Sequence, residues 1–257
     1  MIMPIKRAFG VYMEDFFHEL VPNVRPLREY CQRDFDAAVK VVPSRMIDAA
    51  EDMFKKYLRY DDQNQRRKAE KPFMDNVGSH PHDLPMILVA FSQDVTTTMR
   101  DYGHQFEDAE YFQFPQDELK RMFKVRIMMN DIRVQVAFFA QEEGTVRSMA
   151  AQFALYLEGM SHRRFDACWE FAGMKSYWPC QIASEDVFAS AVPTGTQTLH
   201  VMTIDLTLKC TIPWFKGPTE FEPTDGKGFA GDRYEPAGYP VVQEANINDE
   251  RTVTHGE

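Results

Sequence analysis

The most regular pattern in the chain is an alternation of apolar and polar residues between positions 199 and 212. After His200, every even-numbered residue of this segment is apolar: Met202, Ile204, Leu206, Leu208, Cys210 and Ile212. After Leu199 and Val201, the other parity carries Thr203, Asp205, Thr207, Lys209 and Thr211. A period of two is that of a β-strand with one buried face, so this segment predicts one long strand.

Three other segments repeat apolar residues at steps of three and four, which is the period of an amphipathic helix. They are residues 6–20, 43–60 and 142–160. Ser44 and Thr145 are the predicted N-caps of the second and third helices, because a hydroxyl oxygen can accept a hydrogen bond from a backbone N–H group. Prolines soon after residue 20 end the first helix.

Further strands are predicted over residues 35–43, 84–95 and 123–141, with more strand material between 163 and 190. Within residues 123–141 the apolar parity changes at Asn130 and Asp131, which predicts a bulge or a tight turn. The polar residues 61–82 predict an exposed connection. This order of elements predicts an α+β fold, a mostly antiparallel sheet with helices packed on one face.

From residue 216 onward the chain is acidic, rich in Gly and Pro, and has little apolar periodicity. Such a segment buries too little apolar surface on its own to offset about 1–2 kcal/mol of backbone entropy per residue. We therefore expect an α+β domain over residues 1–215, and over residues 216–257 a disordered tail or an extended arm that orders on a neighbour.

Composition narrows the class of protein. The 257 residues are 44% hydrophobic and 26% charged, which predicts a folded core. The net charge of −10 argues against a nucleic-acid binder, so no sequence-specific nucleic-acid partner is expected.

Charged residues interrupt the apolar start of the chain, and no apolar run reaches about 18 residues, so neither a signal peptide nor a membrane span is expected. The four cysteines have no C-x-x-C spacing, and we interpret them as reduced, buried thiols.

Motifs for catalysis are weak. Gly226, Gly228 and Gly231 match G-x-G-x-x-G, but the residues that follow cannot open the helix that a dinucleotide site needs. His80, His82 and Asp83 could ligate a metal, with His18 or His104 joining only through tertiary folding, but solvated turn histidines are the more ordinary interpretation. We therefore expect no enzyme and no catalytic, cofactor or metal site. A metal-dependent hydrolase that uses the histidine cluster is the minor alternative, beside an unrelated binding protein.

Two features suggest contacts with partners. Arg66, Arg67, Lys68 and Lys71 form a basic cluster in an acidic protein, which suits either an acidic partner surface or a solvated loop. Trp214 and Phe215 end the long alternating segment, and we expect them to anchor the root of the C-terminal arm.

Four stretches together carry a resemblance to a known family. They are a strand that runs through a proline into a helix (residues 39–57), a proline-led strand that turns polar (84–100), a strand followed by an acidic turn and a long helix (126–159), and a final strand that ends in "TIPWFKGP" before an acidic tail. This order resembles the tail terminator, or sheath-stabiliser, proteins of contractile-tailed bacteriophages of the T-even type.

The resemblance implies a protomer of a sixfold ring at the head-proximal end of the virion tail, assembled in the host cytoplasm. Its implied partners are other copies of itself, the tail tube and sheath proteins, and the neck or connector proteins. The family has no catalytic residues to carry over. Another neck or tail-completion ring with the same α+β plan is the alternative that the sequence leaves open.

Overall fold

The computed structural model describes residues 2–42, 84–92, 96–97, 110–184, 187–194 and 199–240. The expected helix over residues 43–60, the connection over 61–82 and the histidines at positions 80, 82 and 104 lie outside these ranges. The chain divides into two compact units. The first comprises residues 1–105, 127–169 and 177–213, and the second comprises residues 106–126, 170–176 and 214–257.

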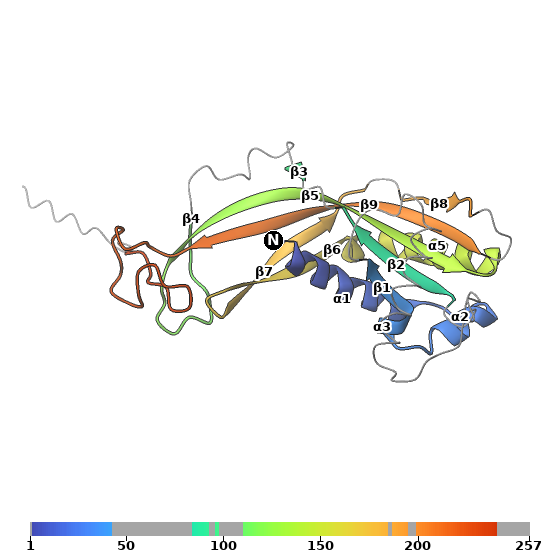
Figure 1. Cartoon of the computed structure of the whole chain (residues 1–257), viewed down its shortest axis with the longest axis horizontal. Helices are drawn as coiled ribbons and strands as arrows, with labels where there is room; N and C mark the ends of the chain where they lie inside the picture. Colours follow the sequence, from blue (N-terminus) through green and yellow to red (C-terminus); the bar gives the residue numbers. More distant parts are fainter. Residues whose placement is uncertain are drawn as a thin grey trace, which may run out of the picture. The chain divides into compact units, whose positions relative to one another are not determined.

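The described fold is α+β, with the elements labelled in Figure 1. The helices are α1 (Met3–Glu19), α2 (Arg25–Tyr30), α3 (Phe35–Ala38), α5 (Glu143–Glu158) and the 3-10 helix η3 (Met160–Arg163). The strands are β1 (Val39–Val42), β2 (Met86–Phe91), β3 (Thr96–Thr97), β4 (Glu110–Phe112), β5 (Phe123–Ala140), β6 (Arg164–Phe171), β7 (Met174–Ile182), β8 (Ala189–Val192) and β9 (His200–Lys216).

The sheet is mostly antiparallel. Its strand order is β1-β2-β5-β9-β7-β6, with β3 and β4 also paired to β5 and β8 paired to β9. The pairing of β1 with β2 is parallel, whereas β2, β3 and β4 pair with β5, and β7 and β8 pair with β9, in antiparallel register. The expectation of an α+β fold with a mostly antiparallel sheet is confirmed.

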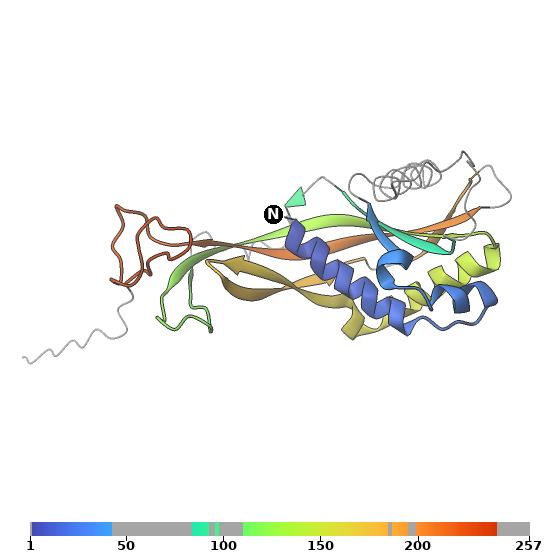
Figure 2. The ribbon, with the colours of Figure 1, turned by 60° about the horizontal axis from the view of Figure 1, so that its bottom comes forward.

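In the first unit, α1 and α5 lie on the same face of the sheet (Figure 2). Their apolar sides meet at Phe16 and Phe153, whose ring centroids are 4.8 Å apart at an interplanar angle of 66°. Phe153 also contacts Phe138 of β5, and Phe9 of α1 contacts Phe91 of β2. These rings belong to one continuous core, in which α1, α5 and the central strands bury their apolar residues together.

The start of α5 differs from its prediction. The helix begins at Glu143, and Glu142 occupies the N-cap position without a capping hydrogen bond from its side chain. Thr145 therefore lies inside the first turn, where it is buried and its hydroxyl donates to the Glu142 carboxylate at 3.3 Å. The prediction that Thr145 is the N-cap was wrong, because the helix already begins at Glu143 and Thr145 lies within its first turn.

The alternating segment forms β9, and its middle follows the predicted pattern. Ile204, Leu206 and Leu208 are buried, whereas Asp205 between them is exposed. Nearer the ends of the strand both parities are buried. Val201, for example, belongs to a second apolar cluster with Leu88 and Phe139. Residues of β9 are thus covered on one face in the middle and on both faces toward the ends.

The structure excludes the tight turn, one of the two breaks predicted in the middle strand. No tight turn interrupts β5, which runs through Asn130 and Asp131 as a single strand of 18 residues. The buried parity changes because different residues of the strand serve different cores. Phe123 belongs to the core of the second unit, whereas Ile132 and the even-numbered residues after it belong to the core of the first.

The second unit has its own small aromatic core. Phe114, Phe123 and Met174 are its buried members, and Phe112, Phe171 and Phe215 pack against them. Residues 217–240 fold back within this unit, where Tyr239 is buried and its N–H donates to the Met122 carbonyl at 2.8 Å. The expectation of a tail or arm from residue 216 did not include this packing within the chain; residues 241–257 lie outside the described ranges.

We expect Leu206→Asp to lower the free energy of unfolding by about 4 kcal/mol or more, because it places an unpaired carboxylate in the core beneath α1 and α5. Urea unfolding followed by circular dichroism measures this difference. Thr207→Asp is the matched control, since Thr207 is only half-buried on the opposite face of β9. Equal stability of the two variants would contradict the assignment of the buried face.

Candidate functional site

Five of the seven exposed aromatic side chains among the described residues belong to the second unit. Six large apolar side chains are exposed among its described residues, and we call them the exposed apolar set: Tyr111, Leu119, Trp214, Phe221, Phe229 and Tyr234. Phe221 is 96% exposed and Tyr234 is 81% exposed. Exposed aromatic residues are the type that most often supplies binding energy in protein interfaces. The set therefore marks the second unit as a candidate partner-binding surface.

Local hydrogen bonds fix the loop that carries three of these residues. The Asp232 carboxylate accepts the backbone N–H groups of Tyr234 at 2.6 Å and Glu235 at 3.0 Å, and these bonds lower the pKa of Asp232. The Phe229 N–H donates to the Glu235 carbonyl at 2.9 Å, and the Ala237 N–H donates to the Phe229 carbonyl at 2.9 Å. A surface that is ordered before binding loses less conformational entropy when a partner arrives.

The three glycines with G-x-G-x-x-G spacing serve the same loop. Gly226, Gly228 and Gly231 all have φ between 75° and 77°, a region that other residues rarely adopt. A Cβ atom at Gly228 would also lie 2.7 Å from the Pro236 carbonyl oxygen. No helix follows them among residues 226–240, so in this structure the glycines shape a loop and not a dinucleotide site.

A buried ion pair connects this loop to the segment before β5. The Arg121 guanidinium donates to Asp117 at 2.9 to 3.2 Å and to the Pro236 carbonyl at 3.0 Å, and both charged side chains are at least 90% buried. Burial alone would raise the pKa of Asp117, but hydrogen bonds from the Arg121 side chain and backbone lower it below its ordinary value. The pair therefore holds together two segments that are far apart in the sequence.

Glu222 makes a second polar junction in this unit. Its carboxylate accepts the Thr219 N–H at 2.8 Å and the Thr219 hydroxyl at 2.9 Å, and these bonds lower the pKa of Glu222 to about 2. The Tyr239 hydroxyl donates to the same carboxylate at 3.2 Å. Burial and then the negative charge of Glu222 raise the pKa of Tyr239 to about 12.

The predicted interface residues differ in their exposure. Trp214 is 57% exposed, whereas Phe215 next to it packs into the aromatic core, 4.9 Å from Phe114 between ring centroids. Adjacent residues of a strand point to opposite faces, which explains the difference. Phe215 thus anchors the end of β9, and Trp214 is the one of the two that offers surface to a partner. Arg66, Arg67, Lys68 and Lys71 lie outside the described residues.

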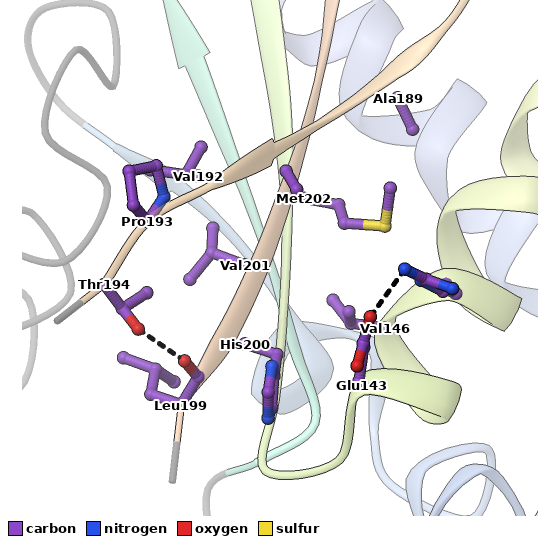
Figure 3. Close-up of a pocket in the computed structure, with 12 residues that line it drawn as sticks. Glu143, Val146, Ala189, Val192, Pro193, Thr194, Leu199, His200, Val201 and Met202 are labelled. Atoms are coloured by element: carbon purple, nitrogen blue, oxygen red, sulfur yellow. Dashed lines mark hydrogen bonds and ion pairs between the residues drawn. The ribbon is translucent and has the colours of Figure 1, made fainter. Parts of the chain in front are cut away.

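The first unit contains an open pocket of about 390 Å³ between the start of α5 and strands β8 and β9 (Figure 3). Its walls include Val146, Val201 and Met202, and Figure 3 shows His200 and Glu143 at its polar side. Glu143 is committed to an ion pair with Arg147 at 2.6 Å. An apolar pocket beside this ion pair suits an apolar side chain of a partner.

A second groove, of about 440 Å³, runs between the end of α1 and α5. Gln152 closes one side by accepting the Val21 N–H at 2.8 Å and donating to the Val21 carbonyl at 3.1 Å. His162 stacks on Tyr156 with ring centroids 4.1 Å apart. Burial, and then the charges of Glu19 and Asp15, raise the pKa of Tyr156 to about 12. Neither pocket was predicted, because each is assembled from segments distant in sequence.

Within the described part of the chain, no three His, Cys, Asp or Glu side chains gather closely enough to hold a metal ion. His80, His82, Asp83 and His104 are not among those residues. The described helices include none long and apolar enough to cross a membrane. Comparison with known proteins gives no matching family model and no matching curated protein.

We expect Arg121→Met to lower the free energy of unfolding by about 3–5 kcal/mol, because it leaves the Asp117 carboxylate buried without its charged partner. Urea unfolding at neutral pH measures the loss. Lys216→Met is the control, since the ion pair of Lys216 with Glu222 is half-exposed and such pairs contribute little to stability. A loss no larger than that of the control would show that the buried pair does not hold the unit together.

The same pair predicts a pH dependence. The pKa of Asp117 is lower in the folded chain than the unfolded value of about 3.9, so its contribution to stability is complete above about pH 4 and is lost as the pH falls through the folded pKa. Asp117→Asn should remove this part of the acid sensitivity, whereas Glu118→Gln, a change at the exposed neighbouring residue, should keep it. Urea midpoints measured between pH 7 and pH 2.5 distinguish the two outcomes.

Proposed function

We propose that this chain is a structural virion protein that forms a ring at the head-proximal end of a contractile tail. The ring ends the growth of the tail tube and sheath and joins the tail to the neck. The order of elements supports the proposal, because an N-terminal helix, a proline-led strand, a strand, acidic turn and helix, and a long final strand all appear in the described fold. These elements are part of the order on which the resemblance to tail terminator proteins rests; the helix expected after the strand of residues 39–42 lies outside the described residues.

The observation that carries the proposal is the presence of three exposed aromatic residues, Phe221, Phe229 and Tyr234, on a loop ordered by its own hydrogen bonds. A ring protein must present fixed surfaces to several neighbours at once, namely other copies of itself, tube and sheath proteins, and neck proteins. Phe221 and Tyr234 stand on such a surface, and their exposure in the single chain is explained if a neighbour covers them. The basic cluster at residues 66–71 is a further proposed contact.

The two units differ from each other in a way that also fits a ring subunit. The first unit buries long strands under two helices and provides a rigid scaffold. The second unit places most of its large exposed apolar side chains on segments held by polar bonds. Another neck or tail-completion ring would use the same features, so it remains the alternative within the same class of protein.

We expect Phe221→Ser combined with Tyr234→Ser to leave the thermal midpoint unchanged but to reduce incorporation into tails by about tenfold or more, because truncated hot-spot residues commonly cost about 2 kcal/mol or more. Purified chain is added to tails that lack it, and incorporation and head joining are counted by electron microscopy.

Phe188→Ser is the matched control, because Phe188 is 72% exposed but belongs to the first unit. Normal incorporation of the control with loss in the double variant supports a role of the second unit in assembly. If the unaltered chain itself neither enters tails nor restores head joining, the proposed function is wrong.

A further inference from the structure

In the first unit, two cysteines lie opposite each other on neighbouring strands of the sheet. In the antiparallel pairing of β7 with β9, Cys180 is the direct partner of Cys210, followed by Gln181 with Lys209 and Ile182 with Leu208. The two cysteines are 30 positions apart in the sequence, and only the register of the two strands brings them together.

The hydrogen bonds of this ladder identify the type of pair. The Ala183 N–H donates to the Thr207 carbonyl at 2.8 Å, and the Thr207 N–H donates to the Ser184 hydroxyl at 2.9 Å, so both N–H groups point toward the other strand, as in a hydrogen-bonded rung. Hydrogen-bonded and non-hydrogen-bonded rungs alternate along an antiparallel ladder. Counting three rungs from Ala183 makes the rung of Cys180 and Cys210 a non-hydrogen-bonded pair.

Non-hydrogen-bonded rungs bring opposite side chains closest, with Cα atoms about 4.5 Å apart. Disulfides join Cα atoms that are about 4.4–6.8 Å apart, so the expected separation lies at the short end of the permitted range. Both side chains also lie on the same face of the sheet, because both are completely buried in the same apolar cluster. Distance and direction are therefore both compatible with a bond between the two sulfur atoms.

Both cysteines are free, buried thiols in this structure. The neighbouring Cys180 thiol, followed by burial, raises the pKa of Cys210 above its ordinary value. A protonated thiol in a dry core reacts slowly with an oxidant, since the thiolate is the nucleophile. Oxidation is therefore expected while the strands are still open, during folding or local unfolding, and not on the closed sheet.

We propose that Cys180 and Cys210 are a redox pair that forms a reversible cross-strand disulfide between β7 and β9. The oxidant is a low-molecular-weight disulfide. One cysteine thiolate attacks it, releases one small thiol and forms a mixed disulfide; the second cysteine thiolate then attacks the protein sulfur of that mixed disulfide and releases the other small thiol. The two cysteines lose two electrons and two protons, and one small disulfide becomes two thiols.

The bond would add a covalent link where the described pairing of β7 with β9 is short. The register covers only three residue pairs, and the bond would close a loop of about 30 residues, a length for which a crosslink restricts the unfolded chain substantially. Oxidation would thus favour the paired arrangement of β7 and β9. The inference concerns a modification site and stands apart from the proposed role in a virion.

The test is an equilibrium measurement on the full chain. A Cys31→Ser, Cys168→Ser variant leaves only the pair, and it is unfolded in urea and refolded in mixtures of reduced and oxidised glutathione. Free thiols are blocked after acid quenching, and mass spectrometry quantifies the peptide that links Cys180 to Cys210. The same mixtures are applied to the chain kept in urea, where both thiols are accessible but the register is absent.

We expect the equilibrium constant for the intramolecular disulfide to be at least about tenfold higher in the refolded chain than in urea, because folding holds the two thiols opposite each other. Reduction should restore both thiols. Adding Cys180→Val, which removes one sulfur with little change of volume, should abolish the linked peptide and leave Cys210 as a thiol or a mixed disulfide. An equilibrium constant in the refolded chain equal to or below that in urea overturns the proposal, as does a bond found only between separate molecules.

Discussion

The packing of α1 and α5 against the central strands is the interaction on which the first unit depends. Phe16 and Phe153 meet between the helices, and Phe153 rests on Phe138 of β5. Each fully buried side chain of this size contributes about 1.5–3 kcal/mol through removal from water. The same contact fixes which face of β5 and β9 is interior, and it therefore decides where polar residues such as Asp205 can stand.

The second unit is stabilised in a different way. Its aromatic core is small, and small cores bury too little apolar surface to hold long loops without other links. Buried polar bonds supply them, chiefly the pair of Asp117 with Arg121 and the bond from Arg121 to the Pro236 carbonyl. Because these bonds hold the loop, Phe221 and Tyr234 can remain exposed on a fixed surface. Exposed aromatic side chains on a fixed surface suit contacts with neighbouring proteins, and this is the physical basis of the proposed function.

Sequence patterns predicted what depends on neighbouring residues. Alternation located β9, helical periodicity located α1 and α5, and the order of elements gave the α+β class. The patterns did not predict features that depend on distant partners. Residues 217–240 have little apolar periodicity, and they are hydrogen-bonded to Arg121, which lies 115 positions before Pro236. The pairing of Cys180 with Cys210 likewise requires a strand register that no local pattern contains.

The most direct test of the proposed function is to count copies of this chain in purified virus particles by quantitative peptide mass spectrometry, with portal and sheath proteins as internal standards. A single closed ring predicts about six copies per particle, far fewer than the sheath protein. Absence of its peptides from mature particles, or a copy number as high as that of the sheath, would contradict a terminating ring.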